Sequence, residues 1–141
     1  MNSEQEITIK NRPPWHPYVI GVVGLIFGPI SAGLVTYVNF KIFGSKIKAI
    51  LTLILSFVYT TLLIIMLSLL PERGAKDLGT VASGIVTPIL FMTIQWYDYE
   101  NWRRKYPGVK TYNAWKTIGW CVVGTVAYFI MAFSFAIVVP M

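Results

Sequence analysis

The chain has 141 residues, of which 55% are hydrophobic and only 13% are charged, and its formal net charge is +6. Soluble chains carry about 25% charged residues, so this composition argues against a soluble domain. A bilayer core about 30 Å thick requires about 20 apolar residues in a helix. Four stretches meet that length without a charged residue in their central turns: 18–40, 47–70, 78–97 and 114–139. The sequence therefore predicts an all-α polytopic membrane protein with four transmembrane helices.

The predicted domain organisation is a polar N-terminal tail over residues 1–16 and one membrane domain over 17–141. Flanking Gly, Pro and Ser residues place the helices at about 17–43, 46–70, 78–105 and 114–139. These helices would form two successive helical hairpins. His16 has no partner at metal-ligand spacing and is expected to be an interfacial cap or spacer ahead of Pro17, which suits a first helical turn.

Small residues mark the first predicted helix. Gly24, Gly28 and Ala32 recur at four-residue intervals, a spacing that lets two membrane helices approach closely. Pro29 removes one backbone hydrogen bond and clashes with the carbonyl of Leu25, so it predicts a kink. That carbonyl must find another donor in lipid, which favours burial of the kink against a neighbouring helix.

The third predicted helix has a similar plan. Asp77 is expected to cap it, Gly79 and Ser83 continue the small-residue spacing, and Pro88 predicts a second kink. The separation between Pro29 and Pro88 equals that between Asn39 and Asp98. These coincidences favour a possible internal pseudo-repeat, in which two copies of one hairpin are related by an axis along the membrane normal.

The third helix leaves its apolar stretch through residues 95–106, QWYDYENWRRKY. Tyr99, Trp102 and Tyr106 follow helical spacing beside three cations, which is typical of a helix at the membrane surface with its aromatic rings at headgroup level. Anionic lipid headgroups are therefore expected partners. The cations predicted to face them are Lys41, Lys46, Lys48, Arg103, Arg104 and Lys105. So short a patch against a membrane predicts no nucleic-acid partner.

Loop charges predict an orientation. The loops after the first and third helices carry eight Lys and Arg residues, and the other side carries four. The positive-inside rule then places both loops in the cytoplasm and both termini outside the cell.

The residues needed for intramembrane catalysis are missing from the sequence. No nucleophile with a base, carboxylate pair or metal-ligand set lies within the apolar stretches, and Cys121 is the single cysteine. Asp98 and Glu100 are expected to be helix-end charges paired with Arg103 and Arg104. The chain is therefore predicted not to be an enzyme, with no catalytic, cofactor-binding or metal-binding residues.

Several short motifs resemble those of small four-helix bacterial membrane proteins of unknown function. They are Gly28-Pro29, the NFKIFG segment at 39–44, the Tyr106-Pro107-Gly108 turn and the Trp-rich start of the last helix. The resemblance implies a bacterial plasma membrane and carries over no functional residue.

Two functions remain open at this point. The first hypothesis is a non-enzymatic accessory or interaction subunit that contacts other membrane subunits or itself, because small-residue faces exceed what one four-helix bundle uses. The alternative is a small transporter or channel, since repeats with interrupted helices often build midplane sites. The absence of ionisable residues inside the helices restricts such a pathway to neutral or lipophilic solutes.

Overall fold

The computed structural model describes residues 13–110 and 117–138, and every regular element in these ranges is helical. The elements are α2 (Pro17–Ile42), α3 (Lys46–Ser68), α4 (Glu72–Val81), the π-helical segment η1 (Ala82–Val86), α5 (Thr87–Lys105) and α6 (Thr117–Val138). Helix α4 continues through η1 into α5, and the three form one continuous rod, Glu72–Lys105. Four helices are thus long and apolar enough to cross a membrane: α2, α3, the α4–α5 rod and α6.

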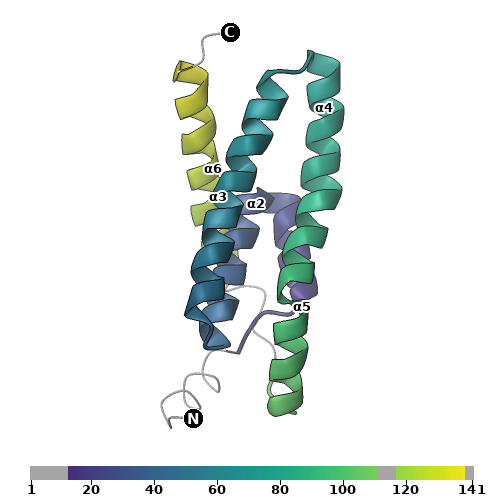
Figure 1. Ribbon diagram of the computed structural model, residues 1–141, viewed down its shortest axis with the longest axis vertical. Coiled ribbons are helices and arrows are strands. Elements are labelled where there is room, and N and C mark those ends of the chain that lie inside the picture. Colours follow the sequence, from purple (N-terminus) through teal and green to yellow (C-terminus); the bar gives the residue numbers. More distant parts are fainter. Residues whose placement is uncertain (1–12, 111–116, 139–141) are drawn as a thin grey trace.

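Although α2 is continuous in sequence, it reverses direction at Gly28. The backbone there has φ 82° and ψ 179°, a conformation that only glycine adopts readily. Pro29 follows, because proline cannot continue a helix but suits the first turn of a new one. Two limbs result, 17–27 and 29–42, and Figure 1 shows them side by side with their turn near mid-height of the molecule.

Two contacts establish this reversal. A Cβ on Gly24 would lie 3.3 Å from the Cβ of Ala32, across the turn. At the open end of the hairpin, the backbone N–H of Trp15 donates to Asn39 Oδ1 over 2.9 Å. Both ends of α2 therefore lie at the same end of the bundle, and the kinked crossing helix predicted from Pro29 is in fact a hairpin.

The limbs are too short to cross a bilayer singly. At 1.5 Å per residue they measure about 16 Å and about 21 Å, against about 34 Å for the 23 residues of α3. A hydrocarbon core is about 30 Å thick. The hairpin therefore reaches roughly half the depth that α3 spans.

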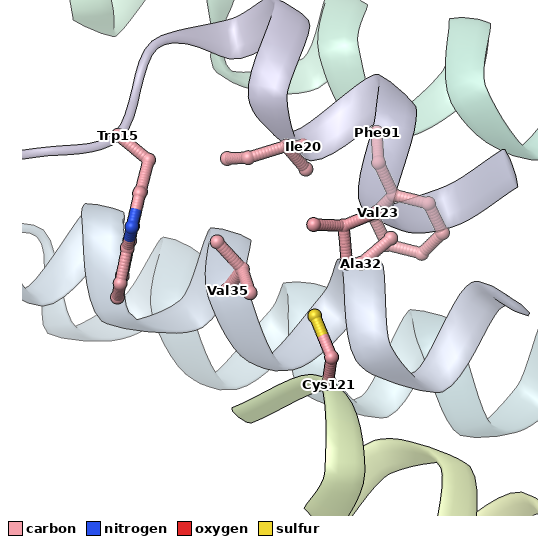
Figure 2. Close-up of a cluster of buried hydrophobic side chains, with 7 residues drawn as sticks. All are labelled: Trp15, Ile20, Val23, Ala32, Val35, Phe91 and Cys121. Atoms are coloured by element: carbon pink, nitrogen blue, oxygen red, sulfur yellow. The ribbon is translucent and has the colours of Figure 1, made fainter. Parts of the chain in front are cut away.

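The α2 hairpin is the centre of the fold. Ile20 and Val23 on the first limb face Ala32 and Val35 on the second, and all four side chains are buried. The same cluster contains Trp15, Phe91 of α5 and Cys121 of α6, as Figure 2 shows. In α2, 61% of the most apolar 18-residue stretch is buried inside the bundle. In each of the other three long helices the buried share of such a stretch is 17%. The other helices thus pack around α2 rather than around one another.

Glycines permit the closest of these contacts. A Cβ on Gly33 would collide with the side chain of Ser56 in α3, and one on Gly124 of α6 would lie 2.6 Å from the Cα of Ser31. The second limb is therefore held between α3 and α6 with almost no space on either side.

Pro88 has a different setting from Pro29. It lies one residue after the start of α5 in an unbroken rod, directly after η1. The Thr87 hydroxyl lies 2.9 Å from the carbonyl of Ala82, which also accepts from the Thr87 N–H and from the Tyr59 hydroxyl. Because one proline follows a chain reversal and the other lies in a continuous helix, the predicted pseudo-repeat is wrong. Asp77 also lies inside α4 rather than at its start.

The bundle has two distinct ends in Figure 1. We call the end that holds Trp15, residues 43–45 and Tyr106 the basic end. The opposite end, which holds residues 69–71 and the last turn of α6, is the far end. The described chain starts at the basic end and finishes at the far end. This arrangement does not fit the prediction that both termini lie on one side.

Candidate functional site

A pocket of about 300 Å³ lies at the turn of the α2 hairpin. It is bounded by the turn itself, by α3, by η1 and by α6. The lining residues are Leu25, Ile26, Phe27, Gly28, Pro29, Leu63, Ser83, Thr125, Tyr128 and Phe129. The pocket exists because α2 stops near mid-height while the surrounding rods continue to the far end (Figure 1).

The polar groups of the pocket are hydroxyls. Ser83 donates to the carbonyl of Gly79 over 2.6 Å, and Thr125 donates to that of Cys121 over 2.8 Å. Each hydroxyl thus uses its proton within its own helix and keeps acceptor capacity for a ligand. The Tyr128 side chain also lines the pocket. Because every lining residue is uncharged, the pocket suits a neutral molecule that has apolar surface and a few donors.

The hairpin turn also brings opposite helix ends together. The C-terminal, partially negative end of the first limb and the N-terminal, partially positive end of the second meet at Gly28. Ser31 joins them, since its hydroxyl lies 3.0 Å from the Phe27 carbonyl and 3.2 Å from that of Cys121. The two end charges partly cancel, so the turn favours a dipolar neutral group over an ion.

At the basic end, a buried amide network closes the hairpin. Asn39 Nδ2 donates to the Trp15 carbonyl over 2.9 Å and to Gln95 Oε1 over 2.8 Å, while Asn39 Oδ1 accepts from the Trp15 N–H. Asn39 and Gln95 are both fully buried. The network joins the segment that precedes α2, the second limb of α2 and α5.

His16 packs among aromatic rings beside that network. Its Nδ1 accepts from the Tyr18 N–H over 3.3 Å, so it caps α2, and its ring centroid lies 4.9 Å from that of Tyr99. Desolvation by burial lowers the pKa of His16, Arg103 lowers it further, and Glu100 opposes both effects. The imidazole is therefore neutral at pH 7 and able to keep its acceptor role.

The cations predicted to face headgroups all lie exposed at the basic end: Lys41, Lys46, Lys48, Arg103, Arg104 and Lys105. Lys48 additionally pairs with Asp98, its Nζ lying 2.8 Å from each carboxylate oxygen. The predicted pairing of Asp98 with the arginines of its own helix is thus wrong. Tyr99 and Trp102, expected at headgroup level, are buried beside Ile42 and Phe43.

The residues predicted to mediate helix packing have different locations. Gly24 lies against Ala32 and Thr87, and a Cβ on Gly79 would lie 3.7 Å from Leu67 of α3. Ser83 lines the pocket, and a Cβ on Gly28 would meet nothing within 4 Å. The tightest contacts, at Gly33 and Gly124, were not predicted. Four positions away, Gly33 has Pro29 and Tyr37, and Gly124 has Trp120 and Tyr128. Four-residue spacing of small residues therefore does not single out either glycine.

Comparisons with protein families, with curated proteins and with solved structures find no match for this chain. Within residues 13–110 and 117–138, no three His, Cys, Asp or Glu side chains are grouped as metal ligands would be. The candidate site therefore rests on the geometry of the α2 turn.

Proposed function

We propose that this protein is embedded in a membrane, with α3, the α4–α5 rod and α6 crossing the bilayer and α2 entering and leaving from the basic side. The support comes from apolar side chains on the outer surfaces of the rods. Ile50, Leu51 and Ile54 of α3 are each more than half exposed, as are Val122, Val126 and Ile130 of α6. In water such surfaces would be costly, whereas lipid covers them.

The reversal of α2 changes the expected orientation. Seven described cations lie at the basic end: Lys41, Lys46, Lys48, Arg103, Arg104, Lys105 and Lys110. Arg73 and Lys76 lie at the far end, where Glu72 and Asp77 offset them. By the positive-inside rule the basic end is cytoplasmic, so the described chain starts on the cytoplasmic side and α6 finishes on the outer side. The membrane proposed is the bacterial plasma membrane.

Within that membrane, we propose that the protein binds and passes a small neutral, largely apolar solute, as a small transporter or channel does. The observation that carries this proposal is the uncharged pocket at the turn of an interrupted helix. Interrupted helices near mid-depth commonly form the solute sites of transporters. Ligand pockets begin at about 300 Å³ and combine apolar walls with a few polar groups, as this one does.

Photolabelling in liposomes tests the binding step. The probe is an uncharged alkyl diazirine with an alkyne handle, and mass spectrometry locates the modified peptides. Thr125→Phe fills the pocket, and Ser134→Phe is its control, because Ser134 bonds the carbonyl four residues earlier in the same way but lies exposed on α6. Label at Leu25–Pro29 should disappear in the first variant and persist in the second. Label spread evenly over α3 and α6, and equal in both variants, would contradict a binding pocket.

A flux measurement tests the transport step. Swelling of the same liposomes driven by a short neutral diol with an alkyl end, 1,2-butanediol, and followed by light scattering, should be faster with wild-type protein than with Thr125→Phe. Labelling of the pocket without any difference in swelling would overturn the transport step and leave a binding function alone.

The second candidate is the interaction subunit. It is favoured by α3 and α6, whose exposed apolar faces would suit a neighbouring membrane helix as well as lipid. Extraction in mild detergent followed by mass spectrometry separates the two functions. A stoichiometric membrane partner, together with an unlabelled pocket, would favour the interaction subunit.

A further inference from the structure

A second cavity lies between α3 and α5 at the basic end. It has a volume of about 380 Å³ and is open to the outside of the bundle. Phe40 of α2 contributes to its wall, and the Lys48–Asp98 ion pair lines it as well. We call it the α3–α5 groove.

The polar and apolar parts of this groove are ordered by depth. Lys48 lies in the first turn of α3, and Leu51 and Leu55 follow one and two turns farther from the basic end. On the antiparallel α5, Asp98 lies on the basic side and Ile94 one turn deeper. A molecule in the groove would thus meet a charged pair first and an apolar channel below it. A phospholipid has that same order of headgroup and chain.

The ion pair has unused hydrogen-bonding capacity. The Lys48 ammonium has three N–H donors and gives two of them to Asp98, while the carboxylate has about four acceptor positions. The Lys48 side chain is 51% exposed and the Asp98 side chain 21%. Each partner can therefore take one further contact of opposite charge without breaking the pair.

We propose that the α3–α5 groove binds one phospholipid with a primary-amine, zwitterionic headgroup, of which phosphatidylethanolamine is the example. Lys48 donates to its phosphate, Asp98 accepts from its ammonium, and one acyl chain lies along Leu51, Leu55 and Ile94. A single cation beside a single anion matches a headgroup that carries both charges. A purely anionic headgroup would be repelled by Asp98, and a trimethylammonium group has no N–H to donate.

This proposal rests on the membrane embedding proposed above, so embedding is tested first. Resistance of the protein to extraction by alkaline carbonate establishes it, and release into the supernatant would remove the basis for a lipid site. Lipid preference is then measured on delipidated protein in detergent by native mass spectrometry. Phosphatidylethanolamine, phosphatidylcholine and phosphatidylglycerol with identical acyl chains are added at equal concentration.

For wild-type protein, the one-lipid adduct with phosphatidylethanolamine should exceed those with the other two lipids about tenfold, the ratio that one charge-assisted hydrogen bond supplies. Asp98→Asn should abolish the preference over phosphatidylcholine, and Lys48→Gln should weaken binding of all three lipids. Lys46→Gln is the control, because Lys46 is exposed on α3 and does not line the groove.

The double variant Lys48→Asp with Asp98→Lys separates a lipid site from a purely structural ion pair. It keeps one charge of each sign, so the melting temperature should stay near that of wild type, but the headgroup contacts are reversed and the lipid preference should fall. Equal adducts with all lipids in wild type would overturn the proposal. A preference for phosphatidylglycerol that depends on Lys48 alone would also overturn it, in favour of an anionic-lipid site.

Discussion

Gly119 and Gly124 are two glycines of α6 in opposite surroundings. A Cβ on Gly124 would collide with Ser31, whereas one on Gly119 would meet nothing within 4 Å. Gly124→Ala should therefore lower the free energy of unfolding by about 1–3 kcal/mol through overpacking. Gly119→Ala should leave it unchanged or raise it by up to about 1 kcal/mol, since alanine favours a helix. Thermal unfolding in detergent, followed by circular dichroism, measures both. Equal effects would mean that α6 does not lie against the second limb of α2.

Asn39 makes three hydrogen bonds in a fully buried position. Asn39→Ala removes all three bonds and should cost several kcal/mol, because each buried hydrogen bond contributes about 0.5–1.5 kcal/mol. Gln95→Leu should cost less, since Gln95 makes one of these bonds and its Nε2 has no partner among the described residues. Asn101→Ala is the control, because Asn101 is exposed. The melting temperature should be lowest for Asn39→Ala, higher for Gln95→Leu and highest for Asn101→Ala, and any other order would contradict the network.

His16 makes stability depend on pH. Its pKa is lowered in the folded protein, mainly by desolvation, so between the folded and unfolded pKa values the unfolded chain binds more protons. The stabilisation is present above the unfolded value of about 6.5 and is lost as the pH falls through the folded value. A protonated Nδ1 also cannot accept from Tyr18. The melting temperature should fall below about pH 6.5 in wild type and fall less in His16→Asn, which keeps a capping acceptor without titrating.

At the scale of one element, Gly28 tests the hairpin. Its φ of 82° and ψ of 179° belong to a region that other residues rarely adopt, and a Cβ there would meet no neighbour within 4 Å. Gly28→Ala should therefore destabilise the protein by about 1–3 kcal/mol through backbone strain alone. Gly74→Ala, inside α4 and without close contacts, should be neutral or stabilising. If Gly28→Ala were also neutral, α2 would be a continuous helix.

The elements show how far sequence reasoning reaches. Helical content and the four long apolar segments follow from the length of the apolar stretches, and Pro29 was correctly recognised as an interruption. The hairpin was not predicted, because Gly-Pro in an apolar run has the same local pattern in a kinked crossing helix and in a reversal. What distinguishes them is tertiary: Asn39 bonds to Trp15, and Gly24 meets Ala32.

The candidate sites were harder to predict for the same reason. Ser83 and Thr125 are ordinary helix residues until the shortened α2 leaves space between them. Lys48 and Asp98 lie 50 positions apart, so local spacing favoured the arginines next to Asp98. Small-residue periodicity selected Gly28, whose role is conformational, and passed over Gly33 and Gly124, whose roles depend on the facing helix.

For the whole molecule, the reversal predicts which positions share a side of the membrane. In a Cys121→Ser background, Pro13→Cys and Lys110→Cys should react with an impermeant thiol reagent from the same side, and Lys76→Cys from the opposite side. Four full crossings would instead place positions 13 and 110 on opposite sides. Labelling of intact and permeabilised cells therefore distinguishes a hairpin from a crossing helix, and it assigns the basic end to the cytoplasm or the exterior.

The position of α2 at the centre of the bundle also has a consequence for biosynthesis. Among the described elements the hairpin is the first to be synthesised. Its Asn39 nevertheless bonds to Gln95, 56 residues later, and its Ser31 lies against the carbonyl of Cys121, 90 residues later. Such distant contacts make folding slow compared with the formation of single helices. The earliest described helix thus becomes the last to acquire its full set of neighbours, and a ribosome that stalls before α6 leaves the hairpin without one of the three helices that pack against it.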